Sequence, residues 1–241
     1  MSREERRLSF GAHAAEYERA RPEWPAEAAR WLVPEGAELV VEVGAGTGKL
    51  TRALALVAPR VVAVEPDPRM RELHPDAVDG SAESIPLGDG EADAVVAGSA
   101  LHWFDLERAL PEFRRVLGDR GRLGFGWNHR DDVLLAEMSA AVRSVRPAGE
   151  SWRSRDWAAE VAAGGLFSGL EHERFEHVLE LPRGELRAHL LSYSGIARLP
   201  EAERDALLER LEPTLAPFEW EDGAGWSLPF VVDAYRATVA V

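Results

Sequence analysis

The sequence predicts an α/β protein built on a doubly wound, mostly parallel sheet. Between about residues 38 and 127, short runs rich in β-branched residues alternate with stretches whose apolar residues recur at three-to-four spacing. The β-branched runs are apolar almost throughout, which is typical of parallel strands covered on both faces by helices. A glycine-rich turn also joins the first run to the helical stretch that follows it. Such a turn is common where an α/β sheet binds a nucleotide-like ligand.

The expected elements of this core follow in chain order. We expect strands at 38–43, 60–65, 92–97 and 121–127, and helices at 50–58, 68–73 and 106–117. In the last helix, Leu106, Leu110, Phe113 and Leu117 form one apolar stripe, and Gly118 is expected to end it. The region of Val78 is a candidate for a short extra strand.

The flanks are less regular. Residues 1–35 tend to be helical between prolines, and further helices are expected at 133–145, 157–163, 185–197 and 201–211, with strands at 170–181 and 228–241. We therefore predict an N-terminal helical cap (1–35), a core (36–181), a helical insert that covers the substrate (182–226) and a terminal strand that returns to the core (227–241).

Composition excludes several classes of function. The 241 residues include no cysteine, so disulfides, cysteine-ligated metals and thiol catalysis are excluded. The net charge of −14 disfavours binding to nucleic acid, which needs basic residues to neutralise phosphates. No uncharged apolar run is long enough to span a membrane, and the start MSREERRLSF lacks the apolar stretch of a signal peptide. We expect a cytoplasmic protein, monomeric or homodimeric, without a metal, since no His, Asp and Glu residues have metal-ligand spacing.

The strongest local signal is the turn in VEVGAGTGKL, residues 41–50. A phosphate-binding P-loop fails here, because Lys49 falls where its second glycine belongs and Leu50 where its lysine belongs. The dinucleotide fingerprint also fails, because Lys49 occupies the position of its third glycine. The observed pattern instead places Glu42 two residues before the first glycine, and a carboxylate at that point suits a cationic ligand better than a pyrophosphate.

A second acidic residue lies at the expected interval. Glu65 closes the second strand, 21 residues after Gly44, and PDP follows it. A carboxylate at the end of this strand can accept hydrogen bonds from both hydroxyls of a ribose. The two motifs together predict a site for a ligand that carries a ribose and a positive charge.

Four stretches together resemble a known family. VVEVGAGTGKL, VVAVEPDPRM, GSAESIPLGDGEADAVVAGSALHWFD and RVLGDRGRLGFGW resemble the successive motifs of class I S-adenosylmethionine-dependent methyltransferases. The similarity is greatest to the small-molecule branch labelled methyltransferase type 11 or ubiquinone/menaquinone-biosynthesis-like, and FGAHAAEYERARPEWP resembles the opening of its bacterial members. The resemblance covers about residues 8–127 and implies a seven-stranded Rossmann-like sheet with S-adenosyl-L-methionine as cofactor.

Carried over residue by residue, the resemblance implies the contacts of that cofactor. Glu65 would bind the ribose hydroxyls. Independently of the resemblance, Tyr17 and Arg21 lie at positions i and i+4 of an expected N-terminal helix, which predicts a lid over the cofactor with Arg21 reaching its carboxylate. The family usually has Asp where this chain has Ser81, so the contact to the adenine amino group is weakened here. The predicted cofactor-binding residues are Glu42, Gly44, Ala45, Gly46, Gly48, Glu65, Pro66, Ser81, Ala82, Glu83, Ser99 and Leu101 from the resemblance, and Tyr17 and Arg21 from their spacing.

The acceptor side is less constrained. Amino-methyltransferases carry an Asn/Asp-Pro-Pro-aromatic signature after the strand that corresponds to residues 92–97. This chain lacks that signature and reads GSAL there, at residues 98–101. His102 is the candidate catalytic residue, as a general base or a substrate contact. Trp103, Asn128 and Tyr193 are candidate substrate residues. We predict methyl transfer to an oxygen, nitrogen or carbon of a small molecule. The alternatives are a non-catalytic S-adenosylmethionine-binding sensor or partner protein, and a nicotinamide-dependent oxidoreductase.

Overall fold

A computed structural model describes residues 14–130, 155–193, 196 and 199–240. The chain forms two compact units. Of the described residues, the sheet unit contains 23–128, 156–175 and 232–240, and the helical unit contains 14–22, 129–130, 155, 176–193, 196 and 199–231. The chain therefore passes several times from one unit to the other. The predicted domain boundaries differ from these ranges and stay a prediction.

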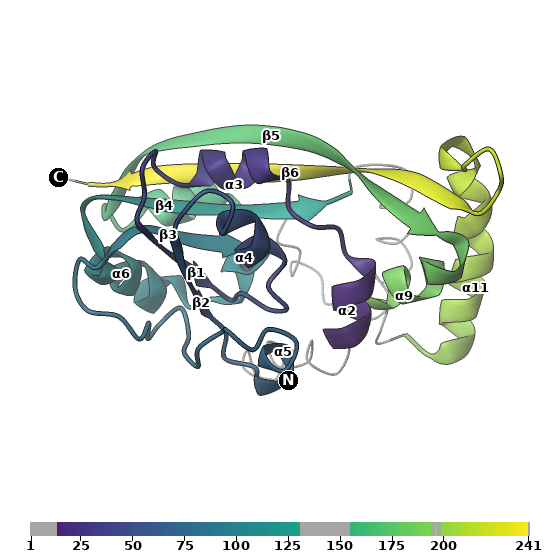
Figure 1. The fold of residues 1–241 in the computed structure, drawn as a ribbon, viewed down its shortest axis with the longest axis horizontal. Helices are drawn as coiled ribbons and strands as arrows, with labels where there is room; N and C mark the ends of the chain where they lie inside the picture. Colours follow the sequence, from purple (N-terminus) through teal and green to yellow (C-terminus); the bar gives the residue numbers. More distant parts are fainter. Residues whose placement is uncertain (1–13, 131–154, 194–195, 197–198, 241) are drawn as a thin grey trace. The chain divides into compact units, whose positions relative to one another are not determined.

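The sheet confirms the predicted fold class. Its six strands lie in the order β2-β1-β3-β4-β6-β5, and their bounds are Leu39–Val43 (β1), Arg60–Val64 (β2), Ala92–Gly98 (β3), Leu117–His129 (β4), Phe167–Pro182 (β5) and Gly225–Val239 (β6). Parallel pairing joins β1 to β2, β1 to β3 and β3 to β4, whereas β6 runs opposite to β4 (Figure 1). Six strands are described where seven were predicted. The expected extra strand at Val78 is a single bridge to Val64.

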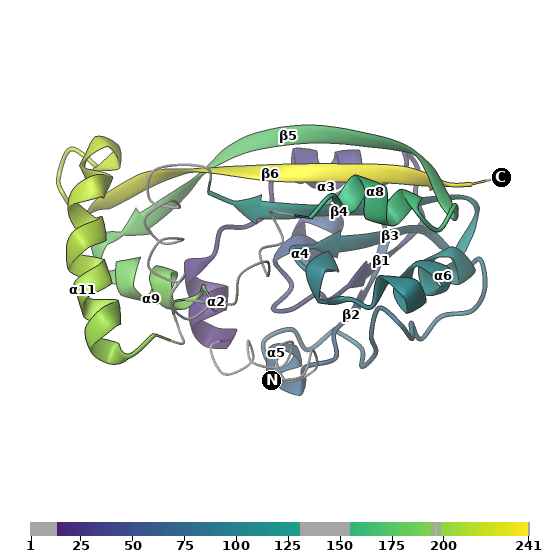
Figure 2. The ribbon, with the colours of Figure 1, turned by 180° about the vertical axis from the view of Figure 1, so that it is seen from behind.

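Helices cover both faces of the sheet unit. One face is covered by α3 (Ala26–Leu32) and α4 (Lys49–Leu54), whose apolar residues share a buried core with Val40 of β1 and Ala94 and Val96 of β3. α6 (Leu106–Val116) and α8 (Trp157–Ala162) lie on the other face, as the two opposite views show (Figures 1 and 2). The short α5 (Pro68–Arg71) follows β2. Side chains that alternate along β1 and β3 thus pack into two cores, which fixes the strand register.

The end of α6 differs from the prediction. The helix ends at Val116, and Leu117 already pairs with Ala92 as the first residue of β4. Gly118 lies inside the strand and does not cap the helix. The expectation was wrong because the buried Leu117 pairs with β3 directly after the helix, so no glycine-terminated turn separates the helix from the strand.

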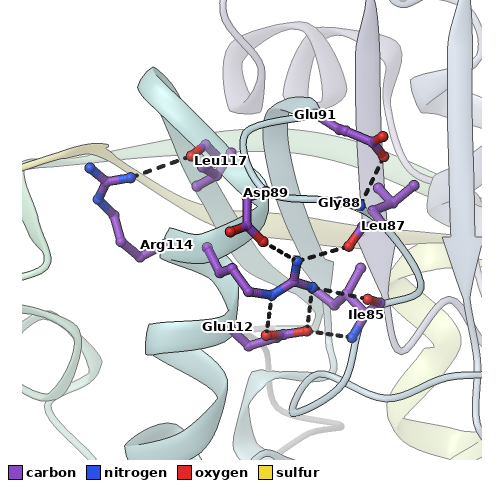
Figure 3. A network of polar contacts seen from close by, with 9 residues as sticks. Ile85, Leu87, Gly88, Asp89, Glu91, Glu112, Arg114 and Leu117 are labelled. Carbon is purple, nitrogen blue, oxygen red and sulfur yellow. Dashed lines mark hydrogen bonds and ion pairs between the residues drawn. The ribbon is translucent and has the colours of Figure 1, made fainter.

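An arginine network holds the loop between residues 85 and 91 against α6 (Figure 3). Arg115 forms ion pairs with Glu112 at 2.8 Å and Asp89 at 2.7 Å, and it donates hydrogen bonds to the carbonyls of Ile85 and Leu87. Glu112 also accepts from the backbone N–H of Ile85, and the Arg115 hydrogen bonds lower the pKa of Glu112. This network fixes the chain directly after the SAE segment, by which we mean the three predicted site residues Ser81, Ala82 and Glu83.

The helical unit has a core of its own. α9 (Leu186–Leu191), α11 (Glu201–Leu211) and the 3-10 helix η5 (Glu212–Phe218) lie in the predicted helical insert. Their buried leucines pack with Trp226, Leu228 and Phe230 of β6. α2 (Ala14–Ala20) belongs to the same unit and packs against α9. The predicted helix at 133–145 lies outside the described residues. None of the described helices combines the length and apolar character that crossing a membrane requires.

Candidate cofactor site

The glycine turn lies at the carboxyl edge of the sheet, directly after β1. Gly44, Gly46 and Gly48 all have positive φ angles, of 70°, 57° and 88°. The turn is tied to the neighbouring strand, because Val64 O accepts the backbone N–H of Gly44 at 2.8 Å and that of Ala45 at 3.1 Å. These φ values are strained for residues with a side chain, so the sequence needs glycine here.

Two of these glycines face different surroundings. A Cβ on Gly44 would lie 2.8 Å from the Cβ of Ala100, so the absence of a side chain lets the turn pack on the segment after β3. A Cβ on Gly46 would meet nothing within 4 Å. The turn therefore presents its backbone to open space at Gly46, and a ligand can approach it closely there.

Glu65 is fixed beside this turn. Its side chain is buried, and its Oε2 accepts the N–H of Gly46 at 2.8 Å while its Oε1 accepts the N–H of Asp67 at 2.8 Å. The two backbone donors fix the orientation of this carboxylate, whose oxygens are hydrogen-bond acceptors. The predicted position of Glu65 at the end of the second strand is thus matched by an oriented carboxylate.

Glu42 is the second carboxylate and lies deeper. Only 1% of it is exposed, and its Oε2 accepts the hydroxyl of Thr51. Burial raises the pKa of Glu42 to about 8, with a further increase from the nearby charge of Glu65, against the opposing Thr51 hydrogen bond. Glu42 is therefore protonated at neutral pH in the protein alone, and a cation placed beside it would favour the ionised form.

Thr47 carries an unsatisfied polar atom in the same turn. The residue is 1% exposed, and no hydrogen-bond partner of its Oγ1 lies in the described part of the chain. A buried hydroxyl without a partner is costly in a folded protein. This orphaned donor and acceptor is the type of group that a bound ligand satisfies.

The SAE segment is folded into a tight turn. Ser81 and Ser84 exchange backbone hydrogen bonds at 3.1 Å, and Ser81 Oγ accepts the N–H of Glu83 at 3.3 Å. The Glu83 carboxylate accepts the N–H of Asp105 at the start of α6, at 2.9 Å. Ala82 is buried. Ser81 and Glu83 thus serve the local fold, and their role toward a ligand stays a prediction.

The segment after β3 brings several predicted residues together. Ser99 has a φ of 53°, its N–H donates to Gly126 O at 2.7 Å, and its Oγ accepts the N–H of Asn128 at 3.2 Å. The His102 ring contacts that of Trp103, with ring centroids 4.7 Å apart and planes tilted by 44°, and its Nδ1 accepts the indole N–H of Trp127 at 3.1 Å. The side chains at the ends of β3 and β4 therefore share one hydrogen-bonded region.

Three predicted residues lie in the helical unit. The guanidinium of Arg21 lies 3.6 Å from the ring centroid of Tyr193 and 5.5 Å from that of Tyr17. Its Nη2 donates to Ser192 O at 3.3 Å. His189, fully buried, contacts Ala20 O at 2.7 Å, and burial lowers the pKa of its imidazole to about 3. The structure thus brings Tyr17, Arg21 and Tyr193 into one cluster.

The sequence is similar to those of known methyltransferases. A family described as methyltransferase domain matches residues 41–125. The chain is 38% identical to an uncharacterized methyltransferase of Mycobacterium tuberculosis, over 99% of both chains. It is 34% identical to an uncharacterized methyltransferase-like protein of Schizosaccharomyces pombe, over 85% of this chain and 84% of the relative. This chain belongs to the methyltransferase family. The resemblance predicted from the sequence is confirmed.

The fold of this methyltransferase agrees with a solved structure. A methyltransferase from Anaeromyxobacter dehalogenans superposes with a TM-score of 0.70 at 20% identity, over 91% of this chain and 98% of that one. The enzyme class and the cofactor, S-adenosyl-L-methionine, are those that the sequence predicted. The family assignment agrees with methyl transfer and not with the nicotinamide-dependent alternative.

The residues of the methyltransferase site fit this cofactor. The open space at Gly46 accommodates a ligand beside the backbone, Glu65 presents oriented acceptors for hydroxyl donors, and Glu42 offers a carboxyl group to a positive charge. The unpartnered Thr47 hydroxyl adds a donor and an acceptor. The chemistry of this donor set therefore matches a ligand with a ribose and a sulfonium.

Sequence reasoning missed three supporting residues of the methyltransferase. Trp127 holds His102, Thr51 holds Glu42, and Glu23 pairs with Lys49 at 2.9 Å and Arg52 at 2.8 Å. Thr51 could have been found from its place on the first turn of the helix after the glycines. Trp127 lies 25 residues from His102, and Glu23 lies 26 residues from Lys49 and 29 from Arg52, so no local pattern indicates those pairs.

Proposed function

We propose that this methyltransferase transfers the methyl group of S-adenosyl-L-methionine to a small-molecule acceptor. When bound, the cofactor supplies a methyl group already activated by its sulfonium, so the protein mainly aligns the partners and excludes water. The observation that carries the proposal is a pair of oriented acidic side chains, the Glu65 carboxylate and the Glu42 carboxyl group, around an open glycine turn.

Each residue has a distinct task in this proposal. Glu65 accepts the ribose hydroxyls, and the N–H groups of the turn and the Thr47 hydroxyl bind the methionine part. Pro66 packs on the adenine, and the Ala82 N–H donates to a ring nitrogen. Glu42 stabilises the positive charge of the ligand. Ser99 and Leu101 border the methyl end, which places His102 and Trp103 beside the acceptor.

The small size of the acceptor is supported by charge and by sequence. A net charge of −14 repels polyanionic substrates such as RNA. The chain reads GSAL after β3, where methyltransferases of nucleobases and glutamine carry their Asn/Asp-Pro-Pro-aromatic signature. A cytoplasmic location and a monomeric or homodimeric state stay predictions from the sequence.

Two measurements test this proposal. Isothermal calorimetry with S-adenosylhomocysteine should give micromolar binding, and NADH at the same concentrations should give none. Radiolabelled methyl from S-adenosylmethionine should pass to a protein-free metabolite extract of the expressing cells. Absence of S-adenosylhomocysteine binding, or label transfer to bulk RNA in place of small molecules, would contradict the proposal.

A further inference from the structure

Glu42 is a carboxyl group placed in an apolar part of the sheet. In the strand register it lies opposite Ala63 of β2 and Val96 of β3, whose side chains point to the same face of the sheet. Val40, two residues earlier on that face, belongs to the core under α4. Only 1% of Glu42 is exposed. Transfer of a carboxylate from water into such surroundings is costly, so burial favours the protonated, neutral carboxyl group.

The hydrogen bonds of Glu42 leave one of its oxygens to a ligand. Thr51 of α4 donates its hydroxyl to Oε2. Among the described residues Oε1 has no hydrogen-bond partner, yet this atom keeps some contact with solvent. One neutral donor does not replace the hydration that a carboxylate loses on burial. A ligand can therefore reach Oε1, and a positive charge beside it would stabilise the ionised form.

The charged groups around Glu42 do not neutralise it, and it forms no ion pair within the described residues. Burial raises the pKa of Glu42 to about 8; Glu65 at the end of β2 adds to the increase, and Arg52 of α4 opposes it. Arg52 is bonded to Glu23, which accepts from its Nε at 3.1 Å and from its Nη2 at 2.8 Å. Lys49, the other cation of α4, pairs with the same Glu23 at 2.9 Å. Glu42 therefore awaits a cation that the chain itself does not supply.

The cofactor and its product differ by one positive charge. S-adenosylmethionine carries a sulfonium where S-adenosylhomocysteine has a neutral thioether, and both share the ribose, the α-ammonium and the α-carboxylate groups. A carboxyl group that ionises only beside the sulfonium would bind the two ligands with different numbers of protons. Burial makes this response large, because solvent screens the interaction between the two charges less.

We infer that Glu42 distinguishes the cofactor from the product by releasing its proton to solvent when the sulfonium binds; this inference rests on the proposed function. The ionised carboxylate then stabilises the positive charge. In the transfer, the acceptor forms the new bond to the methyl carbon with an electron pair of its own, the methyl–sulfur bond breaks, and its electron pair stays on sulfur. Because the thioether that results is neutral, Glu42 takes a proton from solvent again, and the attraction that held the cofactor is lost. Glu42 is therefore a specificity-determining residue that favours cofactor binding and product release.

The number of protons released is measured by isothermal calorimetry at pH 7 in phosphate and in Tris, two buffers with different ionisation enthalpies. Without an acceptor, S-adenosylmethionine should release about one proton more than S-adenosylhomocysteine, because the Glu42 carboxyl group is mostly protonated at this pH. Glu42→Gln, which keeps the shape and cannot ionise, should abolish most of this difference. Glu107→Gln, which changes an exposed residue of α6, should preserve it. Equal release by both ligands would place Glu42 beside the ammonium group that they share, and it overturns the inference.

The pH dependence of affinity gives a second measurement that needs no variant. In the wild type, the ratio of the Kd for S-adenosylhomocysteine to the Kd for S-adenosylmethionine should rise between pH 6 and pH 8, by up to about tenfold per pH unit. In Glu42→Gln the ratio should stay nearly constant. A ratio that does not change with pH in the wild type overturns the inference, even if the variant fails to fold.

Infrared difference spectra follow the carboxyl group itself. The band of a protonated carboxyl group, assigned to Glu42 by its absence in Glu42→Gln, should disappear when S-adenosylmethionine binds and persist when S-adenosylhomocysteine binds. Persistence with both ligands overturns the inference and leaves the proposed function standing, since both ligands are then bound. Failure of the wild type to bind either ligand would instead count against the proposed function.

Discussion

The backbone N–H of Gly46 donates to Oε2 of Glu65 at 2.8 Å, across 19 residues of sequence. The bond joins the two strongest sequence motifs, the glycine turn after β1 and the acidic residue after β2. It orients the carboxylate, and it also holds the turn at the residue whose Cβ position is open. One hydrogen bond thereby positions both the Glu65 carboxylate and the glycine turn, the two features that are predicted to contact the ligand.

Removal of this carboxylate should weaken cofactor binding. We expect Glu65→Ala to reduce the affinity for S-adenosylhomocysteine by about 1–3 kcal/mol, because charge-assisted hydrogen bonds to the ribose are lost and Gly46 is released. Calorimetry measures the change. Glu107→Ala, which removes an exposed carboxylate on α6, is the control and should bind as the wild type does. Unchanged affinity in Glu65→Ala would remove Glu65 from the cofactor site.

A matched pair of glycines tests the open space at the turn. Gly46 and Gly165 have φ angles of 57° and 63°, and a Cβ on either would meet nothing within 4 Å. Alanine at each should therefore lower the free energy of unfolding by a similar amount, about 1–2 kcal/mol. Only Gly46→Ala should also weaken S-adenosylhomocysteine binding, because only there does the methyl group occupy the path of the ligand. Equal affinity in the two variants would make the turn purely structural.

The raised pKa of Glu42 predicts a pH dependence of stability. Its ordinary value of 4.5 rises to about 8 in the folded protein. Between about pH 5 and pH 8 the native state holds one proton more than the unfolded chain, so stability should fall as the pH rises through this window. The slope is at most about 1.4 kcal/mol per pH unit.

Urea unfolding at several pH values measures this slope. Glu42→Gln, which keeps the shape and cannot ionise, should remove most of the decline and should be more stable than the wild type at pH 8. Glu107→Gln should leave the decline intact. Parallel curves for the wild type and Glu42→Gln would show that Glu42 does not cause it.

The sequence predicted the core of the fold because both of its signals are local. Strands covered on both faces are largely apolar, and the runs ending at Val43, Val64 and Gly98 are apolar apart from Glu42, Arg60 and Asp93. Parallel strands place their carboxyl ends at one edge, so the order of the motifs alone groups Gly44, Glu65 and Ser99 in one site. The short strand predicted at Val78 is only a single bridge to Val64, because amino-acid composition does not distinguish one paired residue from a short strand.

Other parts of the site depend on contacts that the sequence does not encode locally. His102 accepts the indole N–H of Trp127, a partner that reaches it only through the register of β4 on β3. Arg21 meets Tyr193 across 172 residues, because α2 packs on α9. Sequence reasoning identified these residues by type and by resemblance, but their partners come from tertiary packing.

The pairing of Arg21 with Tyr193 gives the last prediction. The guanidinium lies 3.6 Å from the ring centroid, and no carboxylate in the described part of the chain pairs with Arg21. A cation over an aromatic face contributes about 0.5–2 kcal/mol. Arg21→Gln and Tyr193→Leu should therefore each lower the free energy of unfolding. The double variant should lose less than the sum, with a coupling energy of about 1 kcal/mol.

A conservative variant and a second measurement complete this test. Tyr193→Phe keeps the ring and removes only the hydroxyl, which lies 3.5 Å from His189, so the coupling to Arg21 should persist. The helical spacing of Tyr17 and Arg21 predicts that Arg21 reaches the carboxylate of the cofactor. Tyr193→Leu should then weaken S-adenosylhomocysteine binding in the wild type and have little effect once Arg21 is replaced. If Tyr193→Leu instead lowers turnover of the acceptor without changing S-adenosylhomocysteine affinity, Tyr193 acts on the substrate, as the sequence first indicated, and Arg21 keeps its orientation without the ring.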